Sequence, residues 1–449
     1  MGRREFLRTL GAGTIGAAGL AALTDPFPFA RAAITPGQKG IYITDLRTAT
    51  ISGLNGNATI IRLDTNKGIS GYGEARCEDT NALSQLATLK PLILGMNPTQ
   101  VDKVFNAIKA VGNPTSDGQA TGSRQTQATG AICAIEMACW DITGKVYNVP
   151  VWKLIGPKLR DRVRLYADTP QQTSISAMQS LVQARINLGL TWFKSDLQLT
   201  YLSSSDYGTS PETGLPYTGI RIKDSGFTKW AAYIAAYRSM IGAAPLSSDH
   251  YQNYNNPQYL DIYSSSHLAD LLAGSSYQGT YGGWMEDIQP WWHPAMFGQV
   301  KSAMTSSMPL LTGEDMYTID QIQTLVNGAG GGVAYIHPDQ STFGGIHQTR
   351  LAAIWAHTQG VRTAIHMSES PLSLICCAHI AAGIPDFLAC EHHYLDDVSW
   401  YDTLFDGIEK PIVEKSTGCV LVPEGPGLGI TPNAAAITAR LASGGYFTQ

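Results

Sequence analysis

The chain is poor in cysteine, in charged residues and in long apolar runs. It has only seven cysteines in 449 residues, and they form none of the CxxC pairs that are typical of zinc sites. Because their number is odd and Cys376 and Cys377 are adjacent, we expect small buried thiols rather than a disulfide framework. No apolar run beyond the N-terminal segment approaches the length that spans a membrane.

Charged residues make up 15% of the chain, and the net charge is -5. Nucleic acids and acidic membranes attract clusters of basic side chains, and no basic run follows the N-terminus. We therefore expect neither a nucleic acid nor a membrane as a partner. The length, with 44% hydrophobic residues, predicts a globular protein that combines one large domain with an accessory domain.

The N-terminal segment has a pattern of its own. Arg3 and Arg4 are followed by Glu5-Phe6-Leu7, a weakly apolar stretch rich in glycine and alanine, and the small-x-small site Ala30-Arg31-Ala32. This pattern resembles the signal of the twin-arginine (Tat) export route. We interpret residues 1–32 as a signal peptide and expect a periplasmic or secreted protein. The alternative is an amphipathic helix of the fold, which the glycines and the missing polar face disfavour.

Beyond Pro150, apolar runs alternate regularly with polar loops and helical segments. The runs end near Tyr166, Lys194, Asp249, Glu286, Glu314, Asp339, His366 and Glu391. Eight such runs at intervals of about one strand and one helix predict a parallel (β/α) barrel. The interval after Lys194 is longer because it contains a polar stretch, residues 201–222, which we interpret as an insertion over the barrel mouth.

Three acidic residues, Asp249, Glu286 and Glu314, each close an apolar run, 37 and 28 residues apart. A barrel delivers such side chains from consecutive strands to one mouth. Converging carboxylates repel one another unless a hard divalent cation binds between them, and Mg²⁺ is the usual one. The spacing therefore predicts a magnesium site. The alternative is that these strand ends are acidic only because they are exposed.

The segment before Pro150 predicts a smaller α+β unit. The runs ATIIRLDT and ISGYGEAR flank the turn Asn66-Lys67-Gly68, which is typical of a hairpin. Residues 99–110 and 130–146 are expected to be helical, and in the second of these apolar residues recur every three to four positions.

Four motifs make the chain similar to the enolase superfamily, in its mandelate racemase and acid-sugar dehydratase branch. They are GISGYGEA at 68–75, AIEMACWDITGKVYNVPVWKLIG at 134–156, PDQSTFGGI at 338–346 and VLVPEGPGLGI at 420–430. The resemblance covers roughly residues 40–431. It implies an α+β capping domain on a modified (β/α)7β barrel, one Mg²⁺ and removal of a proton alpha to a carboxylate. We accordingly expect a capping domain at 33–155, with a contribution from about 405–449, a barrel at 156–404, and a homo-oligomer.

The resemblance also implies roles for individual residues. Asp249, Glu286 and Glu314 match the metal ligands, and Asp287 is the competitor for Glu286. His366 and Asp339 match a His–Asp dyad in which the carboxylate fixes the tautomer of the imidazole and raises its basicity. Glu391 matches an acid that hydrogen-bonds the substrate carboxylate. His392 and His393 are expected to be loop residues.

Two departures leave the second acid/base open. Where the racemase pattern has Lys-x-Lys, this chain has Lys194 in the outer position and Asp196 in the inner one. Where some sugar-acid dehydratases have a histidine two residues after the metal aspartate, this chain has Tyr251, and His250 lies one residue off, on the other face of the strand. The candidates for the second acid/base are Asp196, Tyr251, His250, Tyr166 and Asp168.

We expect a Mg²⁺-dependent lyase that removes water from a hydroxylated sugar acid and forms a 2-keto-3-deoxy product. Syn elimination needs only one proton-transfer group, whereas racemisation needs one on each face of the carbon. The first alternative is a racemase or epimerase in which Asp196 or Lys194 is the second base. The second is a periplasmic binding protein that has lost its activity.

Overall fold

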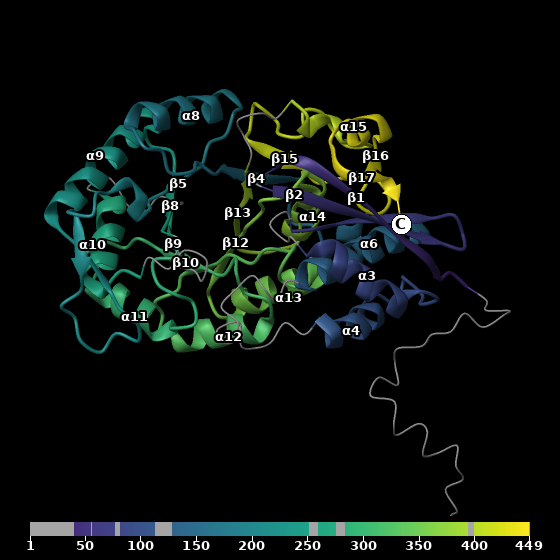
Figure 1. Cartoon of the computed structure of the whole chain (residues 1–449), viewed down its shortest axis with the longest axis horizontal. Coiled ribbons are helices and arrows are strands. Elements are labelled where there is room, and N and C mark those ends of the chain that lie inside the picture. The colour runs from purple at the N-terminus through teal and green to yellow at the C-terminus, as the bar shows by residue number, and fades with distance from the viewer. Residues whose placement is uncertain are drawn as a thin grey trace, which may run out of the picture.

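The computed structural model describes residues 40–54, 56–76, 81–112, 128–250, 259–274, 283–393 and 399–448. The expected signal peptide, Cys77 and Tyr251 lie outside these ranges. Within them the chain forms a smaller α+β domain beside a closed barrel (Figure 1). No helix in these ranges is long and apolar enough to cross a bilayer. The described cysteines are free thiols, and all are buried except Cys419, which is partly exposed.

The smaller domain is a four-stranded antiparallel sheet covered by helices. The strand order is β17 (Leu441–Thr448), β1 (Ile43–Leu54), β2 (Gly56–Thr65) and β3 (Ser70–Ala75). The helices are α3 (Ala82–Ile93), α4 (Val101–Gly112) and α6 (Ala128–Tyr147). Strands β2 and β3 form the predicted hairpin, in which Asp64 pairs with Ser70. The last strand of the chain completes this sheet by pairing with β1.

Helix α6 packs directly on β3, and the glycines of the GISGYGEA motif make this possible. A Cβ atom on Gly71 would lie 2.2 Å from the carbonyl oxygen of Ala138, and one on Gly73 would lie 2.0 Å from that of Ala134. Since real side chains do not approach backbone so closely, only glycine fits at these positions. The motif therefore fixes the distance between the sheet and the long helix that faces the barrel.

Eight parallel strands form the barrel, which closes where the last strand pairs with the first. In order they are β4 (Arg162–Ala167), β5 (Phe193–Asp196), β8 (Leu246–Asp249), β9 (Met285–Glu286), β10 (Leu310–Thr312), β11 (Tyr335–Ile336), β12 (Arg362–Ile365) and β13 (Phe387–His392). This closed parallel barrel with a capping domain confirms the predicted fold class.

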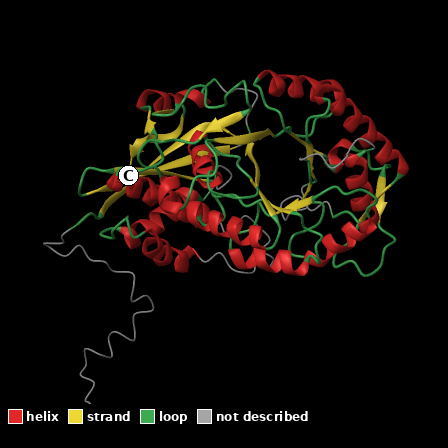
Figure 2. Cartoon of the chain, turned by 180° about the vertical axis from the view of Figure 1, so that it is seen from behind, coloured by secondary structure: helices red, strands yellow, loops and turns green. Residues whose placement is uncertain are grey.

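A helix follows each of the first seven barrel strands, and these helices surround the barrel (Figure 2). They are α8 (Ile175–Asn187), α9 (Asp224–Ile241), α10 (Ile262–Ala273), α11 (Pro294–Ala303), α12 (Ile319–Gly328), α13 (Gly345–Thr358) and α14 (Pro371–Ala381). The inserted stretch contains a small hairpin of β6 (Tyr207–Thr209) and β7 (Ile220–Ile222), which lies beside α10.

The segments that connect the two domains are short. They are α7 (Val151–Ile155) before the barrel, and β14 (Phe405–Asp406), β15 (Cys419–Leu421), β16 (Thr431–Pro432) and α15 (Ala434–Ala439) after it. Strand β15 runs antiparallel to the start of β4, and β14 pairs with β16.

Aromatic side chains fill the interior of the barrel below its mouth. Tyr166, Trp192 and Trp284 form a buried cluster with Leu311 and other apolar residues. The Tyr166 and Trp284 rings meet edge to face, with centroids 5.0 Å apart. The interior is therefore a packed core rather than a pore, as in other barrels of this type, and polar side chains at the carboxyl ends of the strands lie above it.

Candidate active site

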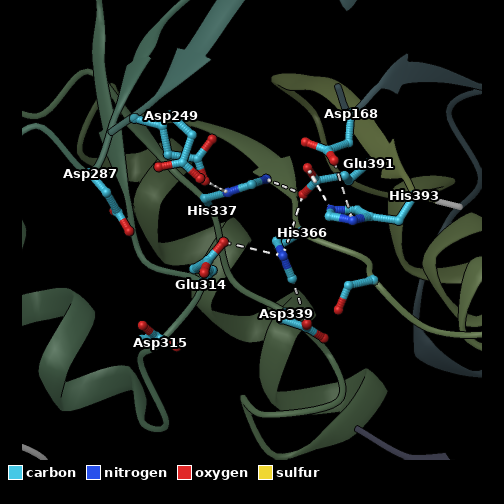
Figure 3. Close-up of polar contacts among 12 residues, drawn as sticks. Asp168, Asp249, Asp287, Glu314, Asp315, His337, Asp339, His366, Glu391 and His393 are labelled. Carbon is cyan, nitrogen blue, oxygen red and sulfur yellow. Dashed lines mark hydrogen bonds and ion pairs between the residues drawn. The ribbon is translucent and has the colours of Figure 1, made fainter. Parts of the chain in front are cut away.

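Polar side chains from most of the barrel strands meet above the aromatic core (Figure 3). They include Asp249, Glu286 and Glu314, together with His337, His366 and Glu391, and each is less than 5% exposed. Asp249 and Glu286 are paired residues at the ends of neighbouring strands β8 and β9. The barrel thus delivers these side chains to one mouth because each stands at, or shortly after, the end of a parallel strand.

Glu286 and Glu314 come together with His337, a residue that was not predicted to belong to the site. One ligand atom of each lies within 4.8 Å of those of the other two. Asp249 is the neighbour of Glu286 across the strands but does not belong to this group. Two of the three predicted ligands therefore converge in the structure, and the third lies beside them.

His337 orients Glu286. Its Nδ1 lies 2.6 Å from Oε1 of Glu286, and its Nε2 lies 2.7 Å from the hydroxyl of Tyr166. Burial, followed by Glu391, raises the pKa of Tyr166 well above its ordinary value, so the phenol keeps its proton. The Nδ1–H of His337 donates to the Glu286 carboxylate, and the Tyr166 hydroxyl is the hydrogen-bond partner of Nε2. Such outer hydrogen bonds fix a ligating carboxylate.

The negative charge in this region is incompletely balanced. Burial raises the pKa of Asp287 well above its ordinary value, and Asp249, Glu314 and Glu286 raise it further. Asp287 has a positive φ of 45° and accepts a hydrogen bond from the Thr312 hydroxyl (2.6 Å). These crowded carboxylate oxygens fit a hard divalent cation such as Mg²⁺, which would relieve their repulsion.

Lys194 lies among the carboxylates. Its Nζ is 2.5 Å from Oε1 of Glu391, 3.6 Å from Oδ2 of Asp249 and 3.7 Å from Oε2 of Glu286. Burial lowers the pKa of Lys194, but Glu286 and Glu391 outweigh it and hold the pKa well above the ordinary value. The structure therefore has a buried ammonium group at the centre of the site rather than at its edge.

Asp196 follows two residues after Lys194 and lies beside Asp249 across the strands. Burial raises its pKa well above the ordinary value, and Asp168 and Asp249 add to this effect. A buried carboxyl with acidic neighbours keeps its proton. The raised pKa makes Asp196 a carboxyl that can exchange a proton beside the site, so it stays a candidate for the second acid/base.

His366 and Asp339 form the expected pair. The Nδ1 of His366 lies 2.6 Å from Oδ2 of Asp339, and its Nε2 lies 3.2 Å from Oε2 of Glu314. Ser341 donates both its N–H and its hydroxyl to Oδ1 of Asp339, each at 2.6 Å. Burial lowers the pKa of His366, but Glu314, Glu391 and Asp339 together hold it well above the ordinary value. The contact with Asp339 thus fixes the orientation of the imidazole.

Glu391 is an ionised carboxylate in this structure. Burial alone would raise its pKa, but Lys194, His393 and His366 lower it well below the ordinary value. An ionised carboxylate only accepts hydrogen bonds. In this arrangement Glu391 pairs with Lys194, His366 and His393.

Of the two histidines after Glu391, only His393 lies beyond the end of β13. His392 is the last residue of β13 and is fully buried, so the expectation that it is a loop residue is wrong. His393 directs its Nε2 to Oε1 of Glu391 (3.0 Å) and its Nδ1 to Oδ2 of Asp168 (3.5 Å). One nitrogen of His393 lies within 4.8 Å of ligand atoms of His366 and Glu391. His366, Glu391 and His393 therefore form one cluster at the mouth of the barrel.

His250 faces away from this site. Its Nδ1 bonds the carbonyl oxygen of Leu197 (2.6 Å), and its ring meets that of Trp230, on α9, edge to face. Since successive residues of a strand face opposite sides, His250 lies on the outer side of β8, opposite to Asp249. This position does not favour His250 as the second acid/base. Tyr251 cannot be placed, because it lies outside the described residues.

The fold and the site together define a barrel enzyme with carboxylates and histidines at the carboxyl ends of its strands. Residues 41–156 match the family described as mandelate racemase / muconate lactonizing enzyme, N-terminal domain, and residues 211–436 match the family described as enolase C-terminal domain-like. The chain therefore belongs to the enolase superfamily, with the two domains of the mandelate racemase and muconate lactonizing enzyme group.

Relatives and solved structures agree with this membership. The chain is 27% identical over 420 residues to the D-xylonate dehydratase of Haloferax volcanii, with 91% of each chain covered. It is 25% identical over 355 residues to the D-galactonate dehydratase of Verminephrobacter eiseniae, covering 77% of this chain and 76% of that one. These matches and the family membership confirm the prediction of an enzyme of the hydro-lyase class.

The fold is shared with solved structures of low sequence identity. A mandelate racemase/muconate lactonizing enzyme-like protein from Rubrobacter xylanophilus has a TM-score of 0.72 at 22% identity, covering 90% of this chain and 99% of that one. An enolase from Pantoea ananatis with bound D-gluconate and Mg has a TM-score of 0.69 at 22% identity, covering 90% and 96%.

Proposed function

We propose that this protein is a Mg²⁺-dependent dehydratase that removes water across C2 and C3 of a hydroxylated sugar acid and releases a 2-keto-3-deoxy acid. The names of the relatives, D-xylonate and D-galactonate dehydratase, support this substrate class. The D-gluconate and Mg held by the Pantoea ananatis enolase support the combination of sugar acid and metal.

The observation that carries the proposal is the buried His366–Asp339 pair. Asp339 accepts the Nδ1–H at 2.6 Å, so the other nitrogen of His366 exchanges protons at the barrel mouth. In the reaction this Nε2 takes the proton from C2. In a syn elimination, the proton that the departing 3-hydroxyl needs is delivered on the same face of the molecule. Dehydration therefore needs proton transfer on one face only, whereas epimerisation needs it on both.

The remaining side chains hold and balance charge. Lys194 provides a buried positive charge beside Asp249 and Glu286, where it can pair with a substrate carboxylate. A Mg²⁺ held by Glu286, Glu314 and the adjacent Asp249 would supply further electrostatic stabilisation for the charge that develops on the substrate carboxylate. Without such stabilisation a carbon acid of this kind is too weak to ionise against an imidazole.

The same site allows two alternatives to the proposed function, an epimerase and a binding protein. In an epimerase, Lys194 would be the second proton-transfer group, because its Nζ lies among the carboxylates at the centre of the site. In a binding protein without activity, the site would hold the carboxylate and transfer no proton. The buried, hydrogen-bonded His366–Asp339 pair favours an active enzyme, because neither residue is needed merely to hold a carboxylate.

The test is a screen of the purified mature protein with Mg²⁺ against a library of sugar acids, with keto acids detected by their semicarbazones. We expect a keto acid from at least one member, and none when His366→Asn replaces the wild type. Inversion at C2 without a keto acid would favour the epimerase. Tight binding without either product would favour the binding protein.

A further inference from the structure

His393 enters the site from the end of β13, the strand next to β12, after which His366 stands. His393 directly follows β13, and its side chain is 16% exposed. Its orienting carboxylate, Asp168, directly follows β4, the strand that pairs with β13 to close the barrel. The backbone N–H of Asp168 donates to the carbonyl oxygen of His392 (3.2 Å), which fixes the two segments against each other. Barrel closure therefore places His393 beside Asp168.

The two histidines have matching surroundings. His366 directs Nδ1 to Asp339 and Nε2 to Oε2 of Glu391 (3.6 Å). His393 directs Nδ1 to Asp168 (3.5 Å) and Nε2 to Oε1 of Glu391 (3.0 Å). Each imidazole thus has one nitrogen toward an aspartate and the other toward the same central carboxylate, and the ring centroids are 5.7 Å apart. This is the arrangement of two proton-transfer groups that serve one substrate.

The distance between them indicates which reaction they serve. One nitrogen of each ring lies within 4.8 Å of the other. Reacting atoms approach to about 3–3.5 Å, so two bases on opposite faces of one carbon would need nitrogens about 6–7 Å apart. Nitrogens closer than this can instead reach two neighbouring atoms on one face of the substrate. A hydrogen on C2 and a hydroxyl on C3 are such a pair.

Resting on the proposed dehydratase function, we propose that His393, oriented by Asp168, is the general acid that protonates the departing 3-hydroxyl while His366 removes the C2 proton. The C2–H electrons form the C2–C3 double bond, the C3–O bond breaks, and the oxygen leaves as water with the proton from His393. The enol then becomes the 2-keto-3-deoxy acid as C3 gains a proton and the C2 hydroxyl loses its own, so that its oxygen becomes the carbonyl. The proton taken by His366 balances the one given by His393.

The experiment compares leaving groups. D-xylonate, D-galactonate and D-gluconate are each tested beside the 3-deoxy-3-fluoro analogue, because fluoride leaves without a proton and hydroxide does not. We expect His393→Asn to lower kcat for water loss by about 10²- to 10⁴-fold while fluoride release stays within about 10-fold of wild type. In the His393→Asn variant, exchange of the C2 proton with deuterated solvent should persist. His366→Asn should lose exchange and both eliminations.

Asp168 is a positioning residue, and Asp168→Asn should produce the same selective loss to a smaller extent. The matched control is His357→Asn, because His357 also pairs with an aspartate, Asp386, but is exposed and lies at the end of α13. The His357→Asn substitution should change neither the loss of water nor the loss of fluoride. His393→Gln is the second variant in case His393→Asn does not fold, and thermal melts test folding in each.

The assignment is overturned if His393→Asn dehydrates at the wild-type rate, or if fluoride release and water release fall equally in folded His393→Asn and His393→Gln proteins. A different result is expected if the protein is not a dehydratase at all. In that case the wild-type protein itself forms no keto acid from any of the three sugar acids.

Discussion

Glu136, on helix α6 of the capping domain, accepts hydrogen bonds from the backbone N–H groups of Ile346 (2.8 Å) and His347 (3.0 Å), in the first turn of barrel helix α13. Gly345 makes this approach possible, because a Cβ there would lie 2.1 Å from the carboxylate and its φ is 87°. The first backbone N–H groups of a helix have no partner within the helix, and Glu136 provides acceptors for two of them. Since α13 follows the loop that carries Asp339, the capping domain fixes one side of the catalytic mouth.

This contact predicts a pH-dependent stability. Burial raises the pKa of Glu136 from 4.5 to about 8, although its hydrogen bonds oppose the shift. The folded protein therefore holds a proton that the unfolded chain releases at lower pH. Stability from this group is fully present below about pH 4.5 and is lost as the pH rises through about 8. We expect Glu136→Gln to flatten this part of the pH dependence of Tm.

The control for this experiment is Glu409→Gln, which removes an exposed carboxylate. Thermal melts of both variants and of the wild type are recorded between pH 5 and 9, at steps of roughly one pH unit. A Glu136→Gln curve that stays parallel to the wild-type curve would contradict the assignment of this pH dependence to Glu136.

The metal site is tested by removing one carboxylate at a time. Glu286→Gln and Glu314→Gln should each weaken Mg²⁺ binding by at least about 100-fold, because each removes a charged oxygen ligand. The fold should persist, because the side chains stand at the barrel mouth. Titration calorimetry measures the affinity, and Mn²⁺ binding provides a second readout.

His337→Asn should weaken metal binding less, by about 10- to 100-fold, because it only orients Glu286. Asp287→Asn is the matched control, since its carboxylate bonds Thr312 instead. If Asp287→Asn loses the metal while Glu286→Gln keeps it, Asp287 rather than Glu286 is the ligand.

The dyad predicts graded losses of activity. His366→Asn should reduce turnover by several orders of magnitude, because it removes the group that takes the proton. Asp339→Asn should cost about 10²- to 10⁴-fold, because the imidazole remains but its tautomer and basicity are no longer held. Both variants should still bind Mg²⁺. Equal activity of Asp339→Asn and wild type would mean that the 2.6 Å contact is structural only.

Export is predicted from the sequence alone. We propose that residues 1–40, fused to a folded reporter, direct it to the periplasm through the Tat system. Replacement of both Arg3 and Arg4 by lysine should leave the reporter in the cytoplasm, because the route recognises the arginine pair. Cell fractionation measures the result. Export of the double variant at the wild-type level would refute the signal.

The sequence predicted the parts of the molecule that repeat with a local period. The apolar runs that end at Asp249, Glu286 and His366 coincide with the ends of β8, β9 and β12 to within a residue. The glycine motif at 68–75 reflects a contact that no larger residue allows. These features could be predicted because strand burial and tight packing restrict which residues occur at each position.

Other parts of the site depend on pairs of residues that are distant in the chain. His337 stands two residues before Asp339, a spacing that allows a shared side of the chain, but its bond to Glu286 requires knowledge of how the strands are arranged. His393 could not be distinguished from a loop residue, because its aspartate partner comes from the other end of the barrel. The central position of Lys194 likewise could not be predicted, because the carboxylates around it come from several strands.

The seam of the barrel also determines when activity can appear during folding. Tyr166 and Glu391, 225 residues apart, become neighbours only when β4 pairs with β13. Contacts between such distant segments are slow to form. A refolding chain can acquire its capping domain, most of its strands and the His366–Asp339 pair before Asp168 meets His393. We therefore expect dehydration to recover later than the bulk of the helical signal, so that enzymatic activity reports on the closure of the barrel.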